Sequence, residues 1–348
     1  MAVTRVVVDL ALLSSLVIAF AVLMYVVLDG FDLGIGVLFP FVRDARDQER
    51  MLASVAPLWD GNETWLVLGG AMLFAGFPAA YAMLFSAWYV PLLILLLALV
   101  FRGVAFEFRP RAQAKWIWGA AFSGGSIVAA FAQGVLLGSF IEGLPATPGE
   151  RWIWLTPFAV MSGAGLVAGY ALLGATWLIY KTDGDLQRWA YTQARRLGFA
   201  VVTFIGIVSL WTPYAEPAIA ARWFTWPNVV WLAPLPIATL GCAVALDRAL
   251  RHKHERAPFG LSVALFVFAY AGLAISIWPY AVPRLLTVWQ AAAPPATQGF
   301  MLIGVALLLP LVLGYPTVSS GARPPISVIT KKIPGGFAGA NLGRRRYK

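Results

Sequence analysis

Four carboxylates lie in apolar segments early in the chain, where a charge is costly if those segments cross a bilayer. Asp29 and Asp32 are three positions apart in one segment, and Asp60 and Glu63 are three positions apart in the next, so each pair shares one face of a helix. Such groups usually face protein or water and mark a path for protons or ions. The sequence therefore predicts a proton pathway through these four acids, with the amide of Asn62 beside them.

Two other interpretations of these acids stay open. They can form a purely structural polar cluster, hydrogen-bonded to the backbone at a helix break near Gly30 or Gly61. They can also hold a sodium ion at Asp29, Asp60 and Asn62, because hard cations prefer oxygen ligands.

The depth of the acids follows from counting along the two helices. Asp32 lies eleven residues before Arg43, and Asp60 lies ten residues after Arg50. At about 1.5 Å per residue, both are roughly 15 Å from the helix ends that those arginines mark. A short loop joins the two helices, which must then run antiparallel, so we expect their acidic faces to meet.

Glycines at positions 30 and 34 make the first helix slim on one side. Small residues four apart let a membrane helix pack closely against a neighbour. The sequence predicts a close helix crossing at Gly30 and Gly34.

The composition indicates an all-α integral membrane protein. Of the 348 residues, 60% are hydrophobic and 12% are charged, and the mean hydropathy is +0.77, whereas soluble domains are about 25% charged. A spanning helix needs about 20 apolar residues. We place nine spans near residues 8–42, 51–76, 79–108, 116–142, 153–180, 188–212, 229–249, 258–282 and 299–320.

Basic residues alternate between the two sides of this layout. The loops after spans one, three, five and seven, with the C-terminal tail, hold 22 of the 26 Lys and Arg residues. Cytoplasmic loops are enriched in Lys and Arg, so we expect the N-terminus outside and the C-terminus, with a basic tail over 323–348, in the cytoplasm near anionic lipid. The net charge of +10 is dispersed in short clusters between apolar segments, which argues against nucleic acid as a partner.

Two further polar groups are candidates at the membrane surfaces. Glu107 lies between Arg102 and Arg109 at the cytoplasmic end of the third span, where we predict a local interfacial salt bridge. Trp278 and Tyr280 end the eighth span on the outer side, where aromatic belts are expected and where a quinone tail is a further candidate ligand.

The sequence offers no catalytic residue, no haem ligand and no metal site besides the sodium alternative. The only histidines, His252 and His254, lie among cations on a cytoplasmic loop, and Cys242 is the only cysteine. A buried imidazole for a haem iron is therefore missing. Alone, the chain should not catalyse redox chemistry.

Three motifs resemble subunit II of the cytochrome bd-type quinol oxidase family. They are VLDGFDLGIG at 27–36, APLWDGNETWLVLGG at 56–70 and FRGVAFEFR at 101–109, in that order. The compact second half and Glu63 after Asn62 look more like the cyanide-insensitive branch of that family. The resemblance implies that Asp60 corresponds to the aspartate that is assigned, in that family, to a proton-entry path toward subunit I.

The resemblance implies a fold, partners and cofactors. It implies one four-helix bundle over 1–145 that carries the acidic motifs, a second over 150–290 and a peripheral ninth helix over 295–322. The partner would be a similar subunit I that carries haems b and d, or b-type haems alone, and passes electrons from quinol to dioxygen in the bacterial inner membrane. A bound quinone and a small accessory subunit stay open.

A proton- or sodium-coupled secondary transporter is the alternative function, because transporters also need carboxylates near the midplane. Inverted repeats would favour transport, and the two halves of the sequence show no convincing similarity to each other.

Overall fold

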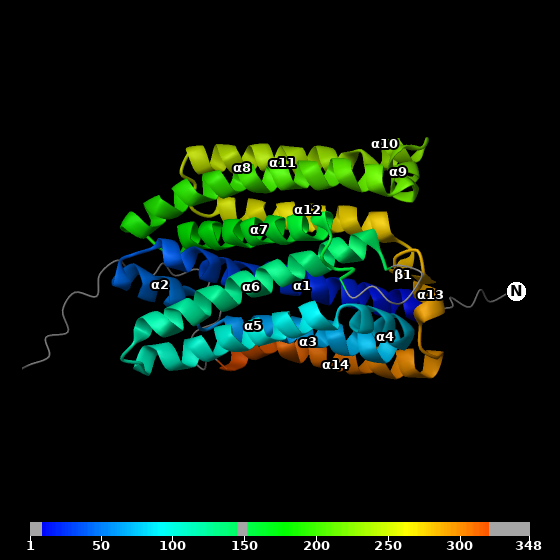
Figure 1. Cartoon of the computed structure of the whole chain (residues 1–348), viewed down its shortest axis with the longest axis horizontal. Helices are drawn as coiled ribbons and strands as arrows, with labels where there is room; N and C mark the ends of the chain where they lie inside the picture. The colour runs from blue at the N-terminus through cyan, green and yellow to red at the C-terminus, as the bar shows by residue number, and fades with distance from the viewer. Residues whose placement is uncertain (1–8, 145–151, 320–348) are drawn as a thin grey trace, which may run out of the picture.

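The computed structural model describes residues 9–144 and 152–319, with side chains described as far as Pro310. Long helices run side by side along the molecule and short helices and loops close its two ends (Figure 1). The predicted basic tail over 323–348 lies outside the described residues. The all-α prediction is confirmed for a membrane protein of several spans.

The helices and strands follow one another in two halves of the chain. In the first half they are α1 (Leu10–Leu38), η1 (Phe39–Phe41), α2 (Ala45–Val55), α3 (Trp59–Gly76), α4 (Pro78–Ala87), α5 (Tyr89–Phe108), η2 (Arg109–Arg111) and α6 (Lys115–Glu142). In the second half they are α7 (Pro157–Lys181), α8 (Gly184–Ala215), α9 (Pro217–Phe224), α10 (Asn228–Leu232), α11 (Pro234–Arg251), α12 (Ala257–Ile277), β1 (Tyr280–Val282), β2 (Leu286–Thr287), α13 (Val288–Ala291) and α14 (Pro295–Ser319).

Membrane-spanning capacity is clear for most of these helices. In the described ranges, seven single helices are long and apolar enough to cross a bilayer, and the pair α3 and α4, bent by 119°, would make an eighth span. The described apolar part of α14, Pro295–Pro310, is shorter. Every one of the nine predicted spans contains at least one helix, whereas the count of nine itself stays a prediction.

Three predicted spans are wrong in detail. Span 51–76 divides into α2 and α3 around Pro57, because α2 is an amphipathic helix whose charged residues cannot enter the bilayer core. Span 79–108 divides at Trp88 into α4 and α5, and span 258–282 ends at Ile277, after which β1 begins.

The core forms around α1, which packs against α3, α6 and α7. A Cβ at Gly34 would lie 1.8 Å from the carbonyl oxygen of Tyr170, and a Cβ at Gly174 would lie 2.5 Å from the backbone of Gly34. Only glycines allow these two backbones to cross so closely. The predicted close crossing at Gly30 and Gly34 is confirmed, and its partner is α7.

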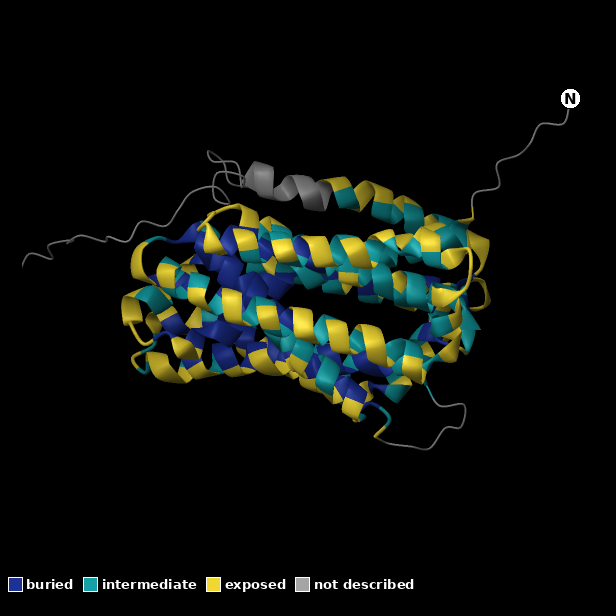
Figure 2. Cartoon of the chain, turned by 90° about the horizontal axis from the view of Figure 1, so that it is seen from above, coloured by how far each residue is buried: buried dark blue, intermediate teal, exposed yellow. Residues whose placement is uncertain are grey.

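The largest buried cluster joins helices of both halves of the chain, from Phe31 on α1 and Phe122 on α6 to Leu178 on α7 and Leu265 on α12. Buried residues gather toward the end of the molecule where α2 lies (Figure 2). The two predicted four-helix bundles therefore share one core across α1 and α7, and their separation into domains stays a prediction.

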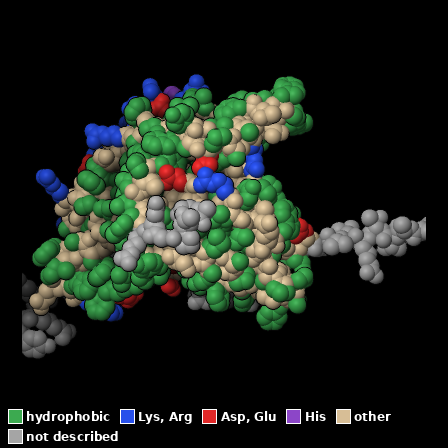
Figure 3. Space-filling model, turned by 45° about the vertical axis from the view of Figure 1, so that its right-hand side comes forward, with side chains coloured by type: hydrophobic (Ala, Val, Ile, Leu, Met, Phe, Trp, Pro, Cys, Tyr) green, Lys and Arg blue, Asp and Glu red, His purple; other side chains and the backbone are tan. Residues whose placement is uncertain are grey.

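Hydrophobic side chains cover much of the face seen in Figure 3. Phe199 and Leu210 on α8 and Phe300 on α14 are among the most exposed apolar residues. Large apolar patches on a protein surface mark contacts with lipid or with another protein. The outside of the molecule thus fits a bilayer and a partner rather than water.

Candidate functional site

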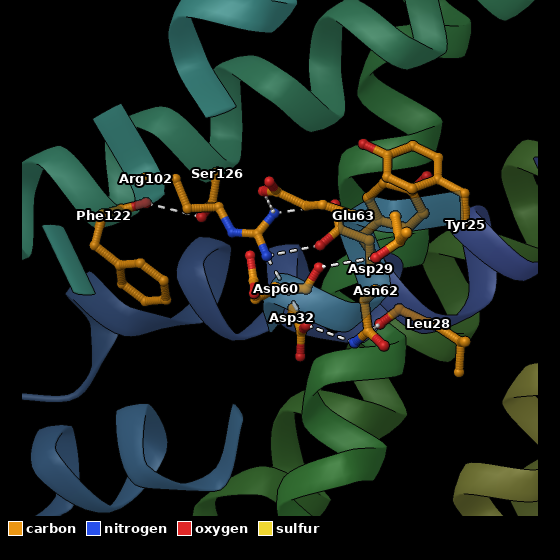
Figure 4. Close-up of polar contacts among 12 residues, drawn as sticks. Tyr25, Leu28, Asp29, Asp32, Asp60, Asn62, Glu63, Arg102, Phe122 and Ser126 are labelled. Carbon is orange, nitrogen blue, oxygen red and sulfur yellow. Dashed lines mark hydrogen bonds and ion pairs between the residues drawn. The ribbon is translucent and has the colours of Figure 1, made fainter. Parts of the chain in front are cut away.

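The buried guanidinium of Arg102 on α5 lies at the centre of the polar residues inside the molecule (Figure 4). Its Nη2 lies 2.6 Å from Oδ1 of Asp29, and its Nη1 lies 3.0 Å from Oδ2 of the same carboxylate. Both side chains are 0% exposed. This two-point contact is the geometry in which an arginine and a carboxylate bind most strongly, so α1 and α5 are joined by a fully buried ion pair.

Asp32 lies one helical turn further along α1 and is also fully buried. The Nδ2 of Asn62 on α3 donates a hydrogen bond of 2.8 Å to Oδ2 of Asp32 and one of 3.1 Å to the carbonyl oxygen of Leu28. Arg102 Nη2 lies 3.8 Å from Oδ2 of Asp32, beyond hydrogen-bonding distance. Asn62 thus ties the first turn of α3 to the acidic face of α1, as the antiparallel arrangement of these helices predicted.

Glu63 and Asp60 extend the acidic cluster toward the surface. The Oε1 of Glu63 lies 3.4 Å from Arg102 Nη1, and the Glu63 side chain is 27% exposed. Asp60 is exposed near the start of α3. The carboxylates therefore range from fully buried to exposed along a short distance of α1 and α3.

Small residues let the helices approach closely at this cluster. A Cβ at Gly125 on α6 would lie 2.6 Å from the carbonyl oxygen of Ala98 and 3.0 Å from the backbone nitrogen of Arg102. On the other side of α1, a Cβ at Gly30 would meet the Tyr170 ring at 2.8 Å. Glycine contacts thus close the space around Arg102 from α6 and hold α1 against α7.

A second group of polar side chains, two buried tyrosines and a half-buried glutamine, lies one turn before Asp29 on α1. The hydroxyl of Tyr170 on α7 donates to Oε1 of Gln133 on α6 at 2.7 Å, and Nε2 of Gln133 donates to the hydroxyl of Tyr25 at 2.8 Å. None of these three residues was predicted from the sequence. A lone glutamine within the apolar run of α6 was the signal that could have indicated them.

Ion pairs of α2 form a layer at the end of the molecule where the basic loops gather. Glu49 accepts from Arg109 Nη1 at 2.8 Å and from Lys115 Nζ at 3.1 Å, and Arg50 Nη2 lies 2.7 Å from Oδ1 of Asp183. Burial raises the pKa of the Glu49 carboxyl, but the hydrogen bonds and charges of Lys115 and Arg109 outweigh burial, so that the pKa lies below its usual value.

The predicted local salt bridge at Glu107 is wrong. Arg102 points into the core to Asp29, and Arg109 binds Glu49. Glu107 is exposed and pairs with neither arginine in the described part of the chain. Helix rotation explains the difference, because Arg102 and Arg109 lie on the buried face of α5 and η2 whereas Glu107 lies on the opposite face.

The residues of the sodium alternative do not converge. Asp29 is bound to Arg102, Asn62 directs its amide nitrogen to Asp32, and Asp60 is exposed. The described ranges also contain no group of three or more His, Cys, Asp or Glu residues able to hold a metal ion. The guanidinium of Arg102 thus supplies the positive charge beside the acids that the sodium interpretation assigned to a sodium ion.

The remaining candidates lie at the two ends of the molecule. Trp278, just after α12, packs edge-on against Trp289 with a centroid distance of 5.6 Å, and Tyr280 lies on β1. A quinone-tail contact at Trp278 and Tyr280 stays a prediction. His252 and His254 are exposed in the loop between α11 and α12, as predicted, so neither can offer a buried ligand to a haem.

Comparisons with known proteins agree with the three motifs. The family model described as cytochrome bd terminal oxidase subunit II matches residues 10–319. Subunit 2 of the cytochrome bd-I ubiquinol oxidase of Escherichia coli is 28% identical over 357 residues, covering 87% of this chain and 90% of that protein. Subunit 2 of the cytochrome bd ubiquinol oxidase of Bacillus subtilis is 29% identical, covering 82% and 88%.

The fold has a solved counterpart. A chain of the bd oxidase from Geobacillus thermodenitrificans superposes with a TM-score of 0.74 at 18% identity, covering 88% of this chain and 97% of that one. That structural likeness supports the fold, and the match of the family model over residues 10–319 shows to which family the chain belongs. The chain belongs to the cytochrome bd terminal oxidase subunit II family.

Proposed function

We propose that this chain, as subunit II of a quinol oxidase, scaffolds a haem-bearing subunit I in the bacterial inner membrane and conducts cytoplasmic protons toward the site of oxygen reduction. The supporting observation is the graded series of acids around Arg102: Asp29 and Asp32 are buried, Glu63 is partly exposed and Asp60 is exposed. Because the family model and the relatives that match this chain are oxidase subunits, the alternative of a secondary transporter is not favoured.

The exposed face of α3 supports a partner at Asp60. Asp60, Val67 and Phe74 follow at intervals of seven residues and so share one face, and Val67 and Phe74 are 69% and 62% exposed. A carboxylate that faces lipid is penalised, by up to about 3 kcal/mol at the centre of a bilayer. We infer that this face contacts subunit I, so that a proton on Asp60 is passed across the interface instead of being exposed to lipid.

The direction of the proposed pathway follows from the basic loops. The C-terminal ends of α1, α5, α7 and α11 lie at the same end of the molecule as α2 (Figure 1). These ends and the following loops carry most Lys and Arg residues, as cytoplasmic loops do. With the N-terminus outside, Asp60 lies near the cytoplasmic end of α3, where protons for oxygen reduction would enter.

The haems of the proposed complex belong to subunit I. Both histidines of this chain are exposed in one loop, so its own residues do not fit a histidine-ligated haem. Haem would supply electron transfer to dioxygen in the partner, whereas the residues of this chain hold and move protons. A bound quinone and a small accessory subunit belong to the same proposal, and for both of them it rests on the family resemblance.

The test is oxygen consumption by the purified, haem-loaded complex carrying Asp60→Asn. An amide cannot release a proton, so we expect slower quinol-driven oxygen consumption with an unchanged visible spectrum. Glu107→Gln is the matched control, because Glu107 is also an exposed carboxylate near the cytoplasmic end of a helix. An Asp60→Asn complex that consumes oxygen as fast as the unaltered one would exclude the proposed role of Asp60.

A further inference from the structure

Three carboxylates surround one guanidinium in the interior of this subunit. Asp29, Asp32 and Glu63 all lie within 3.8 Å of Arg102, and no other Lys or Arg in the described ranges forms an ion pair with any of them. One positive charge can balance only one of these acids. Uncompensated charges in a protein interior cost several kcal/mol each, so at least one buried acid must be neutral.

The hydrogen bonds distinguish the ionised acid from the neutral one. Asp29 receives both donors of the Arg102 fork, which suits a carboxylate. Asp32 accepts a single hydrogen bond, from the uncharged amide of Asn62 to Oδ2, and its buried Oδ1 has no hydrogen-bond partner in the described part of the chain. A bare ionised oxygen in that position would be far more costly than a neutral hydroxyl.

The charged groups near Asp32 come from three helices: Asp29 lies on α1, Glu63 and Asp60 lie on α3, and Arg102 lies on α5 (Figure 4). The phenols of Tyr25 on α1 and Tyr170 on α7 are hydrogen-bonded to Gln133, and Tyr25 lies seven residues before Asp32. Apart from Arg102, these titratable groups are neutral or negative, and Arg102 is already bound to Asp29. Negative neighbours favour the protonated form of Asp32, as burial does.

We propose that Asp32 is the neutral, exchangeable proton carrier of the cluster and that Asp29 is the ion-pair partner of Arg102. Asn62 is the positioning residue, because its amide holds Oδ2 and leaves the hydroxyl on Oδ1. For the route of exchange, through Glu63 and Asp60, the inference rests on the proposed proton-conducting function. The protonation state of Asp32 does not depend on that function.

Infrared spectroscopy of the purified complex tests the protonation state directly. With the aspartate carboxyl carbons labelled with ¹³C, a protonated aspartate gives a carboxylic C=O band that shifts with the label, whereas Glu63 gives an unshifted one. We expect this band in the unaltered complex, its loss in Asp32→Asn, and its persistence in the control Asp44→Asn, which removes an exposed carboxylate. Absence of the band, or its survival in Asp32→Asn, would overturn the inference.

Folding of the variant provides a second test. An amide has nearly the shape of a protonated carboxyl group, so Asp32→Asn should assemble with haem and unfold at the midpoint of the unaltered complex. A failure of Asp32→Asn to assemble would show that a negative charge is needed there, and would equally overturn the inference.

Deuterium exchange separates this inference from the proposed function. Transfer into D₂O should shift the Asp32 band, and Asp60→Asn should slow that shift if Asp60 is the entry. A band that exchanges at an unchanged rate in Asp60→Asn leaves the neutral Asp32 intact and refutes the route. A band that never shifts in D₂O refutes Asp32 as a carrier.

Discussion

Removing Arg102 should destabilise the complex more than removing the acid to which it is bound. In Arg102→Gln, Asp29 loses both of its hydrogen bonds from the guanidinium and has no other cation within ion-pair distance in the described ranges. Breaking a buried ion pair from one side costs about 3–5 kcal/mol. In Asp29→Asn, Arg102 keeps the Glu63 carboxylate at 3.4 Å, so we expect a loss of about 1.5–3 kcal/mol, typical of hydrogen bonds to a charged group.

The measurement is denaturant-induced unfolding of the purified complex in detergent, followed by tryptophan fluorescence. We expect the unfolding midpoint to fall in the order unaltered complex, Asp29→Asn, Arg102→Gln. The double variant should lie above Arg102→Gln, because the stranded carboxylate is then gone, which is a coupling between neighbours of the kind that double-mutant cycles detect. Arg111→Gln, at an exposed arginine nearby, is the control.

Two results would refute this reasoning. If Asp29→Asn lowers the midpoint as much as Arg102→Gln, Glu63 does not compensate the charge of the guanidinium. If the losses in the double variant simply add, Arg102 and Asp29 do not act as a pair.

Three further predictions concern other contacts. Gly34→Ala should abolish accumulation of the folded complex, because its Cβ would lie 1.8 Å from a carbonyl oxygen of α7, whereas Gly70→Ala, with nothing within 4 Å, should accumulate normally in size-exclusion chromatography; equal yields would contradict the close crossing. Glu49 has a lowered pKa, so its contribution to stability is present above its ordinary pKa of 4.5 and is lost as the pH falls through the lower pKa of the folded state. Because Glu49 is 47% exposed, the effect should be small. In Glu49→Gln the unfolding midpoint should fall less steeply toward acid pH, and an unchanged slope would contradict the ion pairs of Glu49. Gln133→Leu removes the hydrogen-bond donor to the Tyr25 hydroxyl and the acceptor of the Tyr170 hydroxyl, and should cost about 1–3 kcal/mol. Changing both tyrosines to phenylalanine as well should restore part of the loss, and no recovery would show that cavity formation dominates.

The sequence predicted the acidic cluster well because the governing physics is local. Carboxylates three apart share a helix face, and successive membrane helices run antiparallel, so the meeting of α1 and α3 was predictable. The connection between them is not the short loop that we expected, because it contains η1 and α2. The depth estimate for Asp60 relied on one continuous helix from Arg50, which the structure does not contain. The contact between Asn62 and Asp32 nevertheless brings the start of α3 to the level of the acids on α1.

The position of Arg102 could not be predicted in the same way. Near the end of a span, an arginine followed by Glu107 and Arg109 is typical of a membrane surface, and the rotation of α5 that turns Arg102 inward depends on packing with α6. Gly125 was the relevant signal, because its missing side chain admits the backbone of Arg102. That role needs two distant segments together, so one sequence without its fold does not reveal it.

The two faces of α1 explain how proton exchange and rigidity can coexist in one helix. Proton transfer needs donors and acceptors held at hydrogen-bonding distances, and the cluster around Arg102 combines groups whose charges change with one that stays fixed. On the opposite face, Gly34 and Gly174 bring α1 and α7 into backbone contact, which leaves α1 little freedom to slide or rotate. A change of charge at Asp32 must therefore be met by the side chains of Asn62, Glu63 and Arg102 and not by movement of α1, and the partial exposure of Glu63 makes it the member of the cluster with most room to respond.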